Sequence, residues 1–198
     1  MESIRCFIAI ELPPELKAEL TRLQNKLRSA TGNCARWVEP NGIHLTLKFL
    51  GNVTPGKVSE ITGAMDEAVK DLPELKFEVA ECGCFPNTHR PQVVWVGLTG
   101  DTKTLGELVK RLEGALTKLG FKPEGRPFTP HLTLARVRDT ATPAERQALG
   151  EAISRAELGI ISGINATGIC LMQSELTPKG AIYTRLAEIK LKKTPKTG

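Results

Sequence analysis

The apolar positions in the first half of the chain change between two periods, which predicts that strands and helices alternate. Ile4 to Ile10 is an almost continuous apolar run, typical of a buried strand. Residues 14–31 carry leucines three or four positions apart, which predicts an amphipathic helix that ends at Thr31-Gly32-Asn33. A second helical stripe runs from Val58 to Leu72, after a capping Thr54 and a first-turn Pro55. Further strands are predicted at residues 44–50, 75–84 and 93–98.

The same order of elements recurs in the second half. A leucine stripe from 105 to 119 predicts a helix, and a strand follows at 131–137. Thr142-Pro143 opens another helix, with Glu145 placed for a capping box. Residues 160–172 are rich in strand formers, and 180–189 form a closing strand. We therefore expect one domain, residues 1–188, built from a pseudo-repeat of about 13–98 and 104–188 and followed by a basic flexible tail, residues 189–198.

One tetrapeptide occurs at the same place in both halves. His44-Leu45-Thr46-Leu47 returns 87 residues later as His131-Leu132-Thr133-Leu134. Because side chains alternate along a strand, His and Thr share one face in each copy and the leucines share the other. The leucine face suits a core, and the other face offers a proton carrier beside a hydroxyl donor. Two related lobes that face each other would bring the two motif strands to opposite sides of one cleft.

This pair of motifs suits the chemistry of a phosphodiester. A neutral imidazole removes a proton from the nucleophile, and a protonated one gives a proton to the leaving oxygen. Thr46 and Thr133 are candidate donors to the phosphoryl oxygens. No acidic cluster lies near either motif, so we expect neither a metal nor another cofactor. From the residues alone, the two histidines are interchangeable.

Two cations near the motifs are candidate phosphate contacts. Lys48 follows His44 by four residues and shares its face if the strand alternates strictly. Arg136 follows His131 by five residues, so strict alternation places it on the leucine face. Its guanidinium would reach the site only if the strand twists or bulges there.

Composition adds little about partners. The formal net charge is +5, but four lysines and no acid lie in the last ten residues, so the body carries only +1 (5 − 4). The apolar run near the start is too short for a signal peptide and no run is long enough to span a membrane, so we expect a cytoplasmic protein with no membrane contact. Five cysteines are expected as free thiols, and Cys82-Gly83-Cys84 lacks the spacing of a zinc knuckle. A Cys-His nucleophile pair stays open, although no local signature supports it.

These motifs are similar to those of a known family. The chain resembles the 2H phosphoesterases, and most closely the bacterial and archaeal RNA 2′,3′-cyclic phosphodiesterases, long called 2′-5′ RNA ligases. The resemblance spans Ile4 to about Glu188. Its markers are Arg5 to Ile10, Trp37-Val38, His44 to Gly51, Phe85-Pro86, Val94 to Gly97, Phe128 to Arg136, Ser174 and Gly180 to Tyr183.

The resemblance implies an α+β fold of two lobes, each an antiparallel sheet with helices, around a central cleft. It implies hydrolysis of a terminal RNA 2′,3′-cyclic phosphate to a 2′-phosphomonoester, with tRNA fragments among the substrates. His44 is the implied proton donor to the departing 3′-oxygen and His131 the implied proton acceptor that activates water. Thr46, Thr133 and Arg136 are the implied phosphate contacts, which favours a local twist at Arg136.

Two alternatives remain beside hydrolysis. The same groups would serve the reverse reaction, which joins a cyclic phosphate to a 5′-hydroxyl in a 2′-5′ linkage, as on tRNA halves. The scaffold could also serve as a non-catalytic RNA- or nucleotide-binding module, although both histidines are retained. Without a linker or coiled coil, we expect a monomer.

Overall fold

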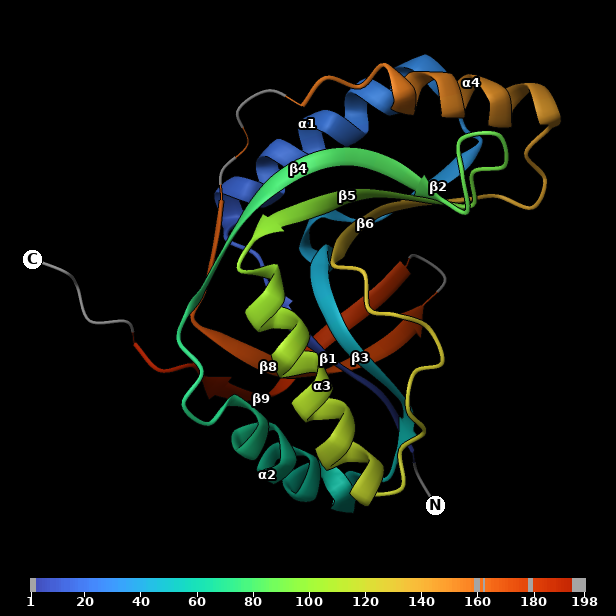
Figure 1. The fold of residues 1–198 in the computed structure, drawn as a ribbon. Helices are drawn as coiled ribbons and strands as arrows, with labels where there is room; N and C mark the ends of the chain where they lie inside the picture. Colours follow the sequence, from blue (N-terminus) through green and yellow to red (C-terminus); the bar gives the residue numbers. More distant parts are fainter. Residues whose placement is uncertain (1–2, 159–160, 162, 178–179, 194–198) are drawn as a thin grey trace, which may run out of the picture.

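The structure is a computed structural model that describes residues 3–158, 161, 163–177 and 180–193. The predicted helices and strands are present, the short strand β2 is an addition, and Figure 1 labels most of them. In chain order they are β1 (Ile4–Glu11), α1 (Pro14–Thr31), β2 (Ala35–Trp37), η1 (Pro40–Gly42), β3 (His44–Val53), η2 (Pro55–Lys57), α2 (Val58–Val69), β4 (Leu75–Phe85), β5 (Val93–Gly100), α3 (Thr102–Lys118), β6 (His131–Val137), α4 (Pro143–Ser154), β7 (Ile164–Ala166), β8 (Gly168–Thr177) and β9 (Gly180–Lys190).

The strands form one antiparallel sheet that divides in its middle. Its order is β7-β4-β5-β6-β3-β1-β8-β9, and β2 also pairs with β6. At the centre, β3 and β6 are joined by one paired position, Leu45 with Leu132. We call β3, β1, β8 and β9 the first lobe, and β2, β6, β5, β4 and β7 the second lobe. The two motif strands therefore lie at the junction of the lobes.

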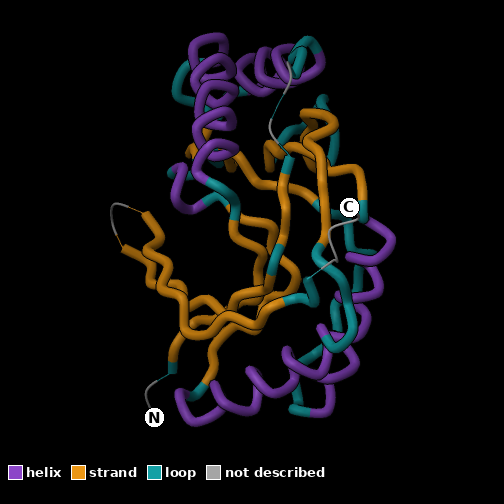
Figure 2. The backbone as a smooth tube through the Cα atoms, turned by 90° about the vertical axis from the view of Figure 1, so that its left-hand side faces the viewer, coloured by secondary structure: helices purple, strands orange, loops and turns teal. Residues whose placement is uncertain are grey.

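Each lobe takes elements from both halves of the chain. Strand β8 from the second half pairs with β1 from the first, and β4 from the first half pairs with β7 from the second. Helices are shared in the same way, because α1 packs against α4 and α2 against α3. Figure 2 shows these two helix pairs at opposite ends of the molecule, with the strands between them. Neither half of the chain therefore builds a lobe alone.

The hydrophobic pattern explains which face each element buries. The leucine stripes of α1 and α3 are buried against the sheet, as predicted. On β1, Ile8 and Ile10 join this main core, whereas Phe7 and Ala9 belong to a small cluster on the opposite face. A strand that is buried on both faces needs a continuous apolar run, which is what β1 has.

The helix starts differ from one another. The predicted capping box is confirmed in α4, where the hydroxyl of Thr142 accepts from the backbone N–H of Glu145 and the Glu145 carboxylate accepts from the N–H of Thr142. Thr54 makes no such side-chain bond, and the 3-10 turn η2 precedes α2. No helix in the described part of the chain is long and apolar enough to cross a membrane.

The start of the expected basic tail needs correction. Residue 189 lies in β9, and Leu191 is buried. The backbone N–H of Leu191 donates to the Thr167 carbonyl at 2.9 Å, and that of Lys192 to the Leu72 carbonyl at 2.9 Å. Buried backbone groups are paired in this way because an unpaired one costs free energy. The remainder of the predicted tail, residues 194–198, lies outside the described residues.

Candidate active site

The two motifs cross at the pair of leucines. Because Leu45 lies opposite Leu132 in an antiparallel pair, extending this register by one residue places His44 opposite Thr133 and Thr46 opposite His131. Both leucines are fully buried, and the four polar residues are half-buried on the other side. We call the side that carries these four residues the motif face. Diagonal neighbours on one face of such a pair are roughly 7–8 Å apart, which places a phosphate within reach of both imidazoles.

A β-bulge lies at the fourth residue of each motif. Between β1 and β3, Ala9 pairs with Thr46 and Ile8 pairs with Lys48, so Leu47 is an extra residue. Between β5 and β6, Trp95 pairs with Thr133 and Val94 with Ala135, so Leu134 is extra. Each bulge shifts the alternation by one position, so the residue after it points into the core and the next one points to the motif face. Strict alternation therefore fails at the same place in both copies.

The bulge removes Lys48 from the motif face, which corrects the prediction that it contacts phosphate beside His44. Its side chain is 3% exposed. Its ammonium lies 2.8 Å from a Glu113 carboxylate oxygen of α3 and donates to the Lys122 carbonyl at 2.7 Å. A buried ammonium requires such partners. Lys48 therefore ties β3 to α3 and to the connection that follows α3.

The equivalent bulge brings Arg136 to the motif face, as the predicted twist required. Ala135 is buried and Arg136 is exposed. Burial raises the pKa of Tyr183 in the first lobe, and the charge of Arg136 acts in the opposite direction. The Arg136 guanidinium, which belongs to the second lobe, therefore lies near the first lobe. Phe49 is the equivalent residue in the first lobe and is 57% exposed. Strict alternation would place Phe49 on the leucine face, so only the bulge shows that it lies on the motif face.

His44 is enclosed by aromatic rings. Phe7 stacks on it with ring centroids 4.6 Å apart, and Tyr183 meets it edge-on at 5.2 Å. Desolvation by this burial lowers the pKa of His44 to about 4. A hydrogen bond with the Gly42 carbonyl and the charge of Glu11, the cross-strand neighbour of His44, act in the opposite direction. The free site therefore favours a neutral imidazole at this position.

His131 is oriented by a similar backbone contact. Its Nδ1 lies 2.7 Å from the Thr129 carbonyl oxygen, two residues earlier. Because a carbonyl only accepts, Nδ1 carries the proton and Nε2 is left to act on a substrate. Phe85 meets the ring edge-on with centroids 5.1 Å apart. Each motif histidine thus bonds to the carbonyl two residues before it, Gly42 or Thr129.

Other candidate chemistry is absent from the described part of the chain. No group of three or more His, Cys, Asp and Glu there could hold a metal ion. All five cysteines are free. Burial raises the pKa of Cys82 and of Cys170 to about 12, which disfavours a reactive thiolate at either one. His89 is exposed in the loop between β4 and β5.

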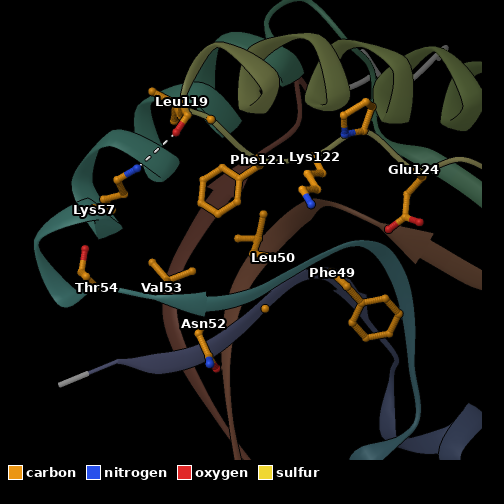
Figure 3. Close-up of a pocket in the computed structure, with 13 residues that line it drawn as sticks. Phe49, Leu50, Asn52, Val53, Thr54, Lys57, Leu119, Phe121, Lys122 and Glu124 are labelled. Carbon is orange, nitrogen blue, oxygen red and sulfur yellow. Dashed lines mark hydrogen bonds between the residues drawn. The ribbon is translucent and has the colours of Figure 1, made fainter. Parts of the chain in front are cut away.

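A pocket of about 590 Å³ is lined by Phe49 and the residues that follow it, and neither motif histidine lines it. Figure 3 shows it between β3 and the chain after α3, with the Lys57 ammonium donating to the Leu119 carbonyl. The distance of that bond is 3.2 Å. Lys57 also lies over the Phe121 ring, 5.7 Å from its centroid. These contacts lie at the end of the first lobe, away from the two motif histidines.

Comparison with known proteins identifies the family of this chain. A family model described as LigT like Phosphoesterase matches the chain twice, at residues 10–95 and 96–183. The RNA 2′,3′-cyclic phosphodiesterase of Methanothermobacter thermautotrophicus is 33% identical over 188 residues, 95% of this chain and 99% of the relative. Its counterpart from Aeropyrum pernix is 36% identical over 172 residues, 86% of this chain and 94% of the relative.

Solved structures have the same fold. A crystal structure of a Thermus thermophilus protein matches with a TM-score of 0.73 and 25% identity, over 95% of this chain and 98% of that one. Escherichia coli LigT, in complex with 3′-AMP, matches with a TM-score of 0.74 and 24% identity, over 96% and 99% of the two chains. The chain belongs to the LigT-like phosphoesterase family. The predicted family, its enzyme class and its two-lobed α+β fold are thereby confirmed.

Proposed function

We propose that this enzyme hydrolyses the 2′,3′-cyclic phosphate at the end of an RNA chain to a 2′-phosphomonoester. The observation that carries the proposal is the crossing of two equivalent His-x-Thr strands, which places two imidazoles and two hydroxyls on one face. The names of the relatives support the choice of substrate. Both histidines come from one chain, so a single protomer holds the whole site, and we propose a monomer whose substrates include tRNA fragments with this end.

The reaction needs two proton transfers on opposite sides of phosphorus. His131 Nε2 accepts a proton from water, whose oxygen forms the new bond to phosphorus. The bond from phosphorus to the 3′-oxygen breaks, and His44 gives that oxygen its proton. Each well-placed acid or base contributes roughly 10²–10⁴ in rate. These roles follow the family resemblance. The contact of His131 Nδ1 with the Thr129 carbonyl supports them, because it leaves Nε2 unprotonated and able to accept a proton.

Three donors act on the phosphoryl oxygens as negative charge builds there. The hydroxyls of Thr46 and Thr133 share the motif face with the two histidines. Arg136 adds a guanidinium, which binds two phosphate oxygens at once and stays charged at every working pH. These groups supply the electrostatic stabilisation that a metal supplies in other phosphoesterases. We therefore propose catalysis without a metal, and full activity in excess EDTA tests it.

The acid role of His44 requires that the substrate raise its pKa. In the free enzyme burial lowers that pKa to about 4. A phosphate anion within contact distance favours the imidazolium and opposes the desolvation. The bound substrate therefore brings the proton onto His44, and Glu11 beside it acts in the same direction.

Phe49 offers a place for the terminal base. It is 57% exposed on the motif face, and its ring centroid lies 6.3 Å from that of Phe7, which stacks on His44. Bases stack on exposed aromatic rings with little sequence preference. The nucleoside then extends along β3 while its phosphate lies between the histidines.

Product analysis on an oligoribonucleotide that ends in a 2′,3′-cyclic phosphate tests the proposal. We expect a 2′-phosphomonoester as the sole new end, and loss of its formation in His44→Ala. With a second RNA that bears a 5′-hydroxyl present, a 2′-5′ joined product would favour the ligase alternative. Binding of the RNA without turnover would favour the non-catalytic module. A 3′-phosphomonoester would contradict the assignment of the leaving oxygen.

A further inference from the structure

Two arginines lie opposite each other on neighbouring strands of the second lobe. Arg36 of β2 pairs directly with Arg136 of β6. Arg36 is exposed, and its neighbours Ala35 and Trp37 are buried, so its side chain points to the motif face with Arg136. Side chains at directly opposite positions of an antiparallel pair have Cβ atoms roughly 5 Å apart. Like charges at that separation are destabilising unless an anion joins them.

No carboxylate neutralises this pair in the described residues. Neither Arg36, Arg90 nor Arg136 forms an ion pair there. In the first lobe, Glu11 is engaged by Arg185, and Glu188 by Arg185 and Lys190. The positive charge beside the catalytic strand is thus uncompensated, although the body of the chain is close to neutral.

A pocket of about 490 Å³ adjoins Arg136 on the side of the loop between β4 and β5. Seven residues line it, among them Arg90, Arg136 and Arg146, and Asp139 is the one acidic residue of the seven. The Arg146 guanidinium donates to the carbonyls of Ala141, Pro91 and Arg138 at 2.9–3.3 Å, so it forms a fixed wall. Because carbonyls are neutral, its charge still acts on the pocket. Arg90 is exposed at the rim.

We propose that Arg36 and Arg90 form a second anion subsite beside Arg136, which binds the phosphodiester that joins the last two nucleotides of the RNA. This inference rests on the proposed function, because it places the cyclic phosphate between the histidines and Arg136. The next phosphate toward the 5′ end is then the nearest further anion, and arginine forks bind phosphate oxygens in pairs. The subsite makes the enzyme prefer an RNA end over a cyclic mononucleotide.

The charge of that one linkage is the quantity to change. We would compare three substrates: 2′,3′-cyclic AMP, the trinucleotide ApApA with a 2′,3′-cyclic phosphate end, and the same trinucleotide with an uncharged methylphosphonate at the last internal linkage. We expect kcat/KM for the charged trinucleotide to exceed that for the mononucleotide roughly tenfold, since a charged hydrogen bond is worth at least that factor. The methylphosphonate removes this advantage. If the methylphosphonate trinucleotide kept the kcat/KM advantage over the mononucleotide, the proposed subsite would be wrong.

Variants locate the effect. Arg36→Ala and Arg90→Ala each lower the ratio of the two kcat/KM values, trinucleotide over mononucleotide, by roughly three- to tenfold. Each also reduces the salt dependence of the trinucleotide reaction by about one phosphate contact. Arg36→Lys keeps part of the ratio, because a lysine keeps the charge without the fork. Arg22→Ala is the matched control, since Arg22 is exposed on α1 and makes no ion pair in the described structure.

The outcomes separate the two proposals. If the wild-type enzyme hydrolyses neither cyclic substrate, the proposed function fails and the subsite fails with it. If it hydrolyses both with equal kcat/KM, only the subsite fails. A ratio unchanged in both Arg36→Ala and Arg90→Ala, in variants whose melting temperatures match the wild type, overturns the subsite as well.

Discussion

The two motif histidines have the same local backbone structure but different side chains around them. Around each, the strand bulges three residues later and a carbonyl two residues earlier binds the ring. His44 is enclosed by Phe7 and Tyr183, and its pKa falls to about 4. His131 is followed on its own face by an exposed arginine, Arg136. The duplicated backbone therefore gives the two imidazoles equivalent positions, and the neighbours that differ are consistent with the different roles proposed for them.

The positions after the two bulges show how the halves have diverged. The inward position holds Lys48 in one lobe and Ala135 in the other, and the outward position holds Phe49 and Arg136. One lobe thus presents an aromatic ring to the site and the other a cation. A base and a phosphate need these two different surfaces, so the divergence fits a nucleotide held across the junction.

Removal of either histidine is expected to have the largest effect. His44→Ala and His131→Ala each lower kcat/KM by roughly 10³, because each removes one proton transfer. The double variant loses little more than one single variant, since the two groups act as a unit. His89→Ala is the control, as this histidine is exposed in a loop. Steady-state rates on a cyclic-ended RNA check this, and a fully active single variant would show that one lobe suffices.

The low pKa of His44 is expected to make the protein less stable in acid. The unfolded chain takes up this proton near pH 6.5 and the folded protein only near pH 4, so stability falls as the pH drops between these values. The loss from His44 is about 3 kcal/mol at pH 4, relative to pH 7. Urea unfolding at both pH values measures it. His44→Gln should show a smaller loss, and an identical loss would place the acid sensitivity elsewhere.

Substitutions of Arg136 and of Phe49 are expected to change different kinetic parameters. Arg136→Ala and Arg136→Lys lower kcat by roughly 10², because the two-pronged contact to the developing charge is lost. Phe49→Ala lowers kcat/KM by roughly tenfold through KM, because it removes a stacking surface. Full kinetic curves separate the two parameters. Equal changes in kcat and KM for both variants would contradict the division between the lobes.

Lys48→Met is expected to affect stability before chemistry. It leaves the Glu113 carboxylate without its cation and the Lys122 carbonyl without its donor, which costs about 2 kcal/mol. The double variant Lys48→Met with Glu113→Gln recovers part of this, since no unpaired charge remains. Thermal unfolding of both variants provides the measurement. An unchanged melting temperature together with a large loss of activity would instead indicate that Lys48 contacts the phosphate.

Much of this site could be predicted from the sequence, up to the point where regular alternation ends. The repeated tetrapeptide predicts that His44 and His131 share one site, and the leucines of the two motifs predict the buried face, which is confirmed. The hydrophobic periodicity of a strand does not reveal an extra residue, so the bulges cannot be predicted from it. The prediction that Lys48 shares the face of His44 is wrong for this reason. The exchange of strands between the halves also has no local signal, because pairing depends on contacts distant in sequence.

The measurement that tests the account most directly replaces the 3′-oxygen of the cyclic phosphate by sulfur. A thiolate leaves without a proton, so it needs no general acid, whereas attack by water still needs a base. We expect this substrate to restore most of the activity lost in His44→Ala and little of that lost in His131→Ala. Restoration in His131→Ala alone, or equal loss in both variants, would contradict the division of labour between the lobes.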